Sequence, residues 1–141
     1  MGLQQVRPHA EMTEVWPRDG RIRLVGRIHG VPADGTWQLV VTRRARAGHT
    51  LRYAADVRDD RFESELPVAD LAAPGHAAVE EWDIHLTDGE VELRAGKHLD
   101  DVRGKKKIFV YPEQRSGDLR VRPYYTIKDN LSLECRTGGS A

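Results

Sequence analysis

The chain has 141 residues with 22 basic and 22 acidic side chains, a length that supports one domain with its own hydrophobic core. It contains no run of about 18 apolar residues and its N-terminal segment lacks an apolar centre, so the sequence excludes a membrane-spanning helix and a secretory signal and predicts a cytoplasmic protein. Its single cysteine, Cys135, excludes an internal disulfide and zinc sites built from several thiolates.

The charges are unevenly distributed along the chain. Residues 1–49 carry 8 basic and 4 acidic groups, residues 50–101 carry 5 and 14, and residues 102–141 carry 9 and 4, which gives sums of +4, −9 and +5. Two interpretations follow. The opposite charges neutralise each other within the fold, or they form separate faces that meet different partners.

Alternation of apolar and polar residues predicts strands along most of the chain, because successive side chains of a strand point to opposite faces. The strands of the first half are expected over residues 21–29, 37–42, 51–57 and 62–66. Residues that tolerate turn dihedrals separate them, including Asp19-Gly20 and Asp59-Asp60. The proline-bounded residues 67–75 predict a single helical turn at the end of the sheet.

The same pattern continues in the second half of the chain. Strands are expected over residues 81–87, 91–94, 108–111, 119–127 and 130–135. Asp88-Gly89 predicts a hairpin between the first two of these, and Pro123 indicates that its strand lies at an edge or contains a bulge.

About ten short strands without a helical period predict an all-β domain. One-sided apolar faces need a second layer to cover them, so we expect a two-sheet antiparallel β-sandwich of immunoglobulin-like type. It is predicted to span residues 13–136, after a flexible segment 1–12 and before a disordered tail 137–141. Residues of the inward strand phase are expected to share one core, among them Leu24, Trp37, Tyr53, Trp82 and Ile84.

No segment fits a phosphate-binding loop or a serine nucleophile, and Cys135 alternates in phase with apolar neighbours. We therefore predict no catalytic residue, no metal and no cofactor. Glu81, Asp83 and His85 share one strand face, where they could ligate a divalent ion or serve a small enzyme. The simpler interpretation is a solvated face that is dispensable for folding.

Two features are candidates for binding. Trp16, just before Pro17 at the rim, is the best candidate for an exposed stacking surface, although a core position is the simpler interpretation. The second is a predicted basic patch that could hold a phosphate-linked polymer or another polyanion, unless its residues neutralise the acidic segment. Its residues are Arg103, Lys105, Lys106, Arg120 and Arg122. Zero net charge disfavours a nucleic-acid partner.

The segments Pro67-Val68-Ala69-Asp70-Leu71 and Glu81-Trp82-Asp83-Ile84-His85-Leu86 resemble later strands of immunoglobulin-like or fibronectin type III-like modules. They also resemble β-sandwich segments that accompany actinobacterial glycosyltransferases and polyol-phosphate transferases of cell-envelope synthesis. This likeness includes Lys97-His98-Leu99-Asp100-Asp101, Pro123-Tyr124-Tyr125-Thr126 and the following Asn130-Leu131-Ser132. The resemblance covers roughly residues 60–135. In such proteins the catalytic centre lies in a separate α/β domain, so the resemblance implies an accessory module without activity.

The sequence therefore predicts a non-catalytic module that recognises a partner protein or a glycan or polyol-phosphate chain. The alternative is a small enzyme with a loop-built active site near Glu81, Asp83 and His85. An enzyme requires a pocket with converging titratable groups beside that strand, which distinguishes the two hypotheses.

Overall fold

The computed structural model describes residues 8–44, 49–72, 79–96, 111–126 and 130–136. Its elements are β1 (His9–Arg18), β2 (Arg21–His29), β3 (Trp37–Arg43), β4 (Thr50–Arg58), β5 (Arg61–Pro67), the 3-10 turn η1 (Val68–Leu71), β6 (Val79–Thr87), β7 (Glu92–Gly96), β8 (Gln114–Ser116), β9 (Leu119–Tyr125) and β10 (Leu131–Arg136). Within this part of the chain, no helix has the length and apolar character that crossing a membrane requires.

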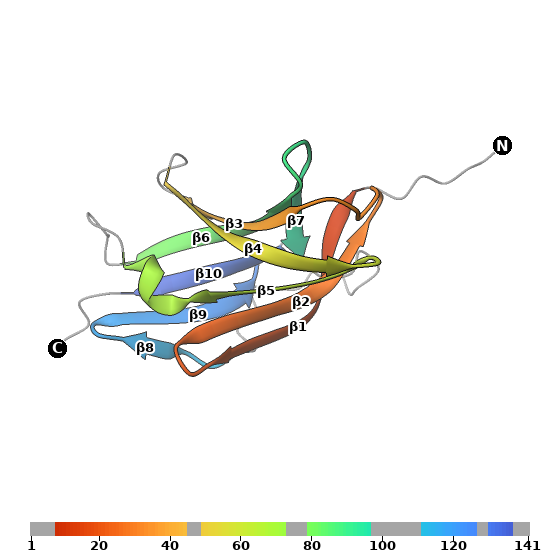
Figure 1. The fold of residues 1–141 in the computed structure, drawn as a ribbon. Coiled ribbons are helices and arrows are strands. Elements are labelled where there is room, and N and C mark those ends of the chain that lie inside the picture. The colour runs from red at the N-terminus through yellow and green to blue at the C-terminus, as the bar shows by residue number, and fades with distance from the viewer. Residues whose placement is uncertain (1–7, 45–48, 73–78, 97–110, 127–129, 137–141) are drawn as a thin grey trace.

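The strands form a closed barrel with an extension. Hydrogen-bonded neighbours follow the order β3, β4, β5, β2, β1, β7 and β6, and β6 pairs with β3 again, so these seven strands complete a ring. Strands β10, β9 and β8 continue the sheet from β6 (Figure 1). The prediction of an all-β chain is confirmed, but the two-sheet immunoglobulin-like sandwich is wrong.

The ring closes because two strands pass from one layer to the other. Strand β4 pairs with β3 through residues 50–55 and with β5 through residues 56–58. Strand β7 pairs antiparallel with β6 through residues 92–94 and parallel with β1 through Ala95 and Gly96. These two crossings close the seven-strand ring, whereas the two sheets of a sandwich keep free edge strands. Alternation in the sequence predicts the face of a side chain but not the partner of a strand.

The core consists of the inward-facing side chains of the strands, which fill the interior of the barrel. Leu24, Trp37, Trp82 and Ile84 belong to one buried cluster, as predicted, and Tyr53 packs against it while remaining half-buried. The cluster also contains Phe62 and Leu66 of β5 and Leu131, Leu133 and Cys135 of β10. Burial raises the pKa of the Cys135 thiol to about 12, so this group stays protonated and is a poor nucleophile.

Strand β1 contains an irregularity that decides which of its side chains face outward. The pairing of β1 with β2 shifts register between Met12 and Glu14. Before the shift Met12 is buried, and after it Val15 is buried, so the inward phase changes from even to odd positions. Trp16 is thereby turned to the outside of the barrel. The segment expected to be flexible, residues 1–12, overlaps the start of this strand, and the predicted tail 137–141 lies outside the described residues.

Candidate functional site

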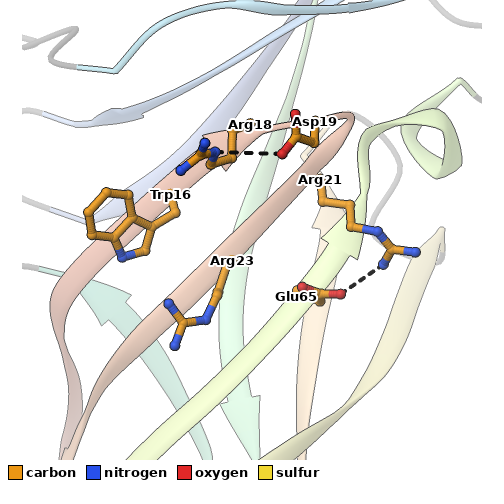
Figure 2. Close-up of a pocket in the computed structure, with 6 residues that line it drawn as sticks. All are labelled: Trp16, Arg18, Asp19, Arg21, Arg23 and Glu65. Atoms are coloured by element: carbon orange, nitrogen blue, oxygen red, sulfur yellow. Dashed lines mark hydrogen bonds and ion pairs between the residues drawn. The ribbon is translucent and has the colours of Figure 1, made fainter.

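The outer face of β1, β2 and β5 carries an exposed tryptophan at the end of a row of polar side chains. Trp16 lies opposite Arg23 in the pairing of β1 with β2, and Arg23 lies opposite Glu65 in the pairing of β2 with β5. Residues directly opposite each other in antiparallel strands share a face. The three side chains therefore form one row across three strands (Figure 2).

Trp16 has the properties of a stacking surface. Trp16 is 46% exposed, whereas Trp37 and Trp82 are buried. The indole Nε1–H donates a hydrogen bond of 2.8 Å to Glu14 Oε1 on the same strand, which fixes the orientation of the ring. An oriented, partly exposed indole provides apolar contact for the C–H face of a ligand. The simpler interpretation, a core position for Trp16, is therefore wrong, and its role as a stacking surface stays a prediction.

Three arginines line the same depression as this indole, and each contacts a carboxylate (Figure 2). Arg21 Nη1 lies 2.8 Å from Glu65 Oε2, and Arg23 Nε lies 2.6 Å from Glu63 Oε2. Arg18 Nε lies 3.6 Å from Asp19 Oδ2, and the Arg18 side chain is 73% exposed. Each of these contacts uses one guanidinium nitrogen, and a guanidinium has five N–H donors in a fixed plane. The side chains are therefore positioned and still have donors available for a ligand.

The ion pair of Arg23 with Glu63 keeps both side chains charged. The hydrogen bond from Arg23 holds the pKa of the Glu63 carboxyl below its usual value, and the positive charges of Arg23 and Arg61 act in the same direction. The same hydrogen bond raises the pKa of Arg23. Both groups are thus ionised at neutral pH, and the face presents donors and acceptors side by side.

A groove runs along this face in two connected parts. The first part has a volume of about 370 Å³ and is lined by Trp16, Arg18, Asp19, Arg21, Arg23 and Glu65 (Figure 2). The second has a volume of about 520 Å³ and is lined by Arg23, Tyr53, Ala54, Ala55, Asp56, Glu63, Ser64 and Glu65. Because Arg23 and Glu65 line both parts, they form one elongated depression, which we call the Trp16 groove.

The second part of the groove exists because β4 and β5 diverge. Their pairing ends at Asp56 and Glu63, and residues 50–55 of β4 pair with β3 instead. Ser64 Oγ donates a hydrogen bond of 2.7 Å to the Ala54 carbonyl across this opening. The Tyr53 hydroxyl donates one of 2.8 Å to Asp70 of η1, and burial together with this bond raises the pKa of Tyr53. The phenol is therefore neutral and fixed at the far end of the groove.

The predicted basic patch is only partly described by the structure. Arg103, Lys105 and Lys106 lie outside the described residues. Arg120 and Arg122 lie on the outer face of β9, as their spacing predicts, and Arg122 Nη2 lies 3.2 Å from Glu134 Oε1 of β10. The binding role of these residues stays a prediction.

Glu81, Asp83 and His85 lie on one face of β6, but the expectation that they are solvated is wrong. Arg44 contacts both Glu81, at 2.9 Å, and Asp83, at 2.6 Å. Arg94 contacts Asp83 at 3.0 Å. The described part of the chain contains no group of three side chains suited to hold a metal ion. These carboxylates are engaged by guanidinium groups instead.

Asp83 also accepts a hydrogen bond of 2.9 Å from Ser132, and the Tyr124 hydroxyl donates to Glu81. Burial alone raises the pKa of Asp83, but the bonds from Arg44 and Ser132 and the charge of Arg94 outweigh it, so the pKa lies below its usual value. Asp83 thus remains ionised and does not have the raised pKa of a general acid. The contacts on this face connect β6 with β7, β9 and β10.

The sequence did not indicate Arg21, Arg23, Glu65 or Tyr53 as parts of the same site as Trp16. Arg21 and Arg23 alternate with apolar residues, which places them outward, but the pattern carries no information on the strand beside them. One part of the site was indicated in the sequence by the Asp19-Gly20 turn. A tight turn there reverses the chain, so that Arg21 pairs with Arg18 and Arg23 pairs with Trp16.

No family model and no curated protein matches this chain. Among solved structures, a crystal structure of S. aureus TarS is similar with a TM-score of 0.66 and 15% identity, over 93% of this chain and 25% of that one. A shorter TarS fragment gives a TM-score of 0.65 and 15% identity, over 99% of this chain and 41% of the fragment. The chain therefore spans less than half of either, and at this identity the likeness is one of fold.

Proposed function

We propose that this domain is a non-catalytic accessory module that binds a glycan or polyol-phosphate chain in the Trp16 groove. The observation that carries the proposal is the oriented, exposed indole of Trp16 at the end of a groove lined by three arginines. Sugars and polyols present C–H faces and neighbouring hydroxyl groups. An indole packs against the first, and guanidinium and carboxylate groups bond the second.

The shape of the groove favours a chain over a compact ligand. It extends from Trp16 on β1 across β2 and β5 to Tyr53 on β4. An aromatic side chain thus lies near each end, with Arg23 and Glu65 between them. Successive units of a linear polymer can occupy such a site together.

The fold likeness supports the same class of ligand. TarS is a wall teichoic acid glycosyltransferase, and its structure contains a part similar in fold to this chain. Such an arrangement favours a role in which an accessory domain holds the polymer beside a catalytic domain. For this chain the association with a transferase is part of the proposal.

The test is a titration of the protein with a glycerol-phosphate oligomer and, separately, with a neutral oligosaccharide. Tryptophan fluorescence monitors the binding in each titration. Trp37 and Trp82 are buried, so a ligand-dependent change reports Trp16. We expect Trp16→Ala to weaken binding roughly tenfold, about the contribution of one aromatic contact. Val79→Ala removes an equally exposed apolar side chain elsewhere and should leave affinity unchanged.

The binding itself is measured for the variants by calorimetry, because Trp16→Ala removes the fluorescent reporter. Equal affinity of the Trp16→Ala and Val79→Ala variants for both ligands would exclude the groove as the binding site. Absence of binding to either ligand by the unmodified protein would exclude the proposed function.

A further inference from the structure

Three arginines form a row on the outer face of the extension. Arg115 of β8 lies opposite Arg120 of β9, and Arg120 lies opposite Arg136 of β10. Leu119 and Val121, which flank Arg120, are buried, so the arginine side chains are on the other face. Neighbouring strands lie about 4.8 Å apart, so the row spans roughly 10 Å. We call these three residues the arginine row.

The positive charge of the row is only partly compensated. Arg136 Nε lies 3.2 Å from Glu134 Oε1. In the described part of the chain, Arg115 and Arg120 form no ion pair and no side-chain hydrogen bond, and Asp118 in the turn between them pairs with neither. Like charges directly opposite each other destabilise a sheet.

The rest of the fold treats its arginines differently. Most other arginines on the strands contact a carboxylate, including Arg21, Arg23, Arg27, Arg43 and Arg94. Arg115 and Arg120 are therefore an exception to a general arrangement, at a position where a carboxylate on either neighbouring strand would relieve the repulsion. An external anion compensates such a pair when it binds.

We infer that the arginine row binds phosphate groups of an anionic chain. A guanidinium presents two parallel N–H donors that match two phosphate oxygens, which a single ammonium group does not. Three such groups over this span can contact more than one phosphate. The inference does not depend on the Trp16 groove, because no residue of the row lines it.

The position of β8 places this second site close to the first. Gln114 of β8 accepts a hydrogen bond of 2.7 Å from the Gly20 N–H and donates one of 2.8 Å to the Arg21 carbonyl. The strand that carries Arg115 is thus fixed to the turn between β1 and β2 (Figure 1).

The test uses inorganic tripolyphosphate as the probe, with calorimetry at low salt. We expect the double variant Arg115→Gln and Arg120→Gln to bind it at least roughly tenfold more weakly, the effect of losing one or two charge-assisted hydrogen bonds. The slope of log affinity against log salt should become shallower as well. The control is Arg52→Gln with Arg58→Gln, which removes the same charge from exposed positions of β4.

Equal affinity of the two double variants would overturn the inference, and so would equal affinity of the unmodified protein for tripolyphosphate and for a polyglutamate of matched charge. The Trp16→Ala variant separates this result from the proposed function. Retention of tripolyphosphate binding by Trp16→Ala, with its loss in the row variant, supports the inference even when the groove binds no glycan.

Discussion

The guanidinium of Arg94, on β7, contacts the carboxylate of Asp83, on β6, at 3.0 Å, and both side chains are 23% exposed. Arg44, which follows β3, and Ser132 of β10 donate to the same carboxylate at 2.6 and 2.9 Å. Arg94 also donates to the carbonyls of Ile84 and Leu131. One carboxylate thus links segments that are distant in the sequence.

Replacement of Asp83 by asparagine should therefore destabilise the fold. The variant leaves Arg94 and Arg44 without their shared anion at a half-buried position, where solvent screens part of the effect, so we expect a loss of about 1–3 kcal/mol in the free energy of unfolding. Urea denaturation measures it. Asp56→Asn, at an exposed position of β4, is the matched control and should change the free energy by less than about 0.5 kcal/mol.

The contribution of Asp83 should depend on pH. Its pKa in the fold lies below the usual value of 3.8, so the stabilisation is complete above that value and is lost as the pH falls through the lower pKa of the folded state. The difference in stability between the unmodified protein and Asp83→Asn should be constant down to about pH 5 and should shrink below about pH 4. A difference that stays constant to pH 2.5 would contradict this role.

His85 should produce a second pH effect at a higher pH. Burial, and the positive charge of Arg94, lower the pKa of His85 from its usual value of 6.5, and the opposing charges of Glu92 and Asp83 do not reverse this. The folded state therefore keeps the imidazole neutral, whereas the unfolded chain takes up a proton near pH 6.5, so stability falls as the pH drops below that value.

The measurement is the melting temperature of the unmodified protein and of His85→Gln at pH 7 and pH 5. We expect the unmodified protein to lose more on acidification than the variant, because the other five histidines are common to both. Equal losses would show that His85 is protonated as easily in the fold as in the unfolded chain.

Gly26 lies where β1, β2 and β5 approach closely. A Cβ atom on this residue would lie 2.2 Å from the Glu11 carbonyl oxygen and 2.6 Å from the ring of Phe62. The carbonyl belongs to the backbone and cannot turn away, so we expect Gly26→Ala to cost about 1–3 kcal/mol or more, measured by urea denaturation. Gly117→Asn, at a turn position with φ of 61° and open space, should be nearly neutral.

Much of the local structure follows from the alternation of the sequence. Strand β2 has the predicted bounds, and the predicted helical turn is present as η1. Pro123 lies at an edge as predicted, because the pairing of β9 with β8 ends at Val121 while Pro123 still pairs with β10. These features depend on residues close together in the chain, which is the information that a pattern contains.

The closure of the barrel and the composition of the site could not be predicted in this way. Closure depends on where β4 and β7 change partners, and no residue type at Ala55 or Ala95 marks that change. The outward position of Trp16 depends on the register shift after Met12, which reverses the phase of β1. The engagement of Asp83 by Arg44 and Arg94 depends on contacts between strands that are far apart in the sequence.

Strand β6 has a pairing arrangement with a consequence for unfolding. One of its edges pairs with β3, while the other is divided between β10, through residues 79–83, and β7, through residues 85–87. The extension is joined to the ring through β6 and through a bridge of Gly96 with Asn130, so it loses these backbone hydrogen bonds when the ring unfolds. The extension is therefore not a separate folding unit, and the whole domain should melt in one cooperative transition.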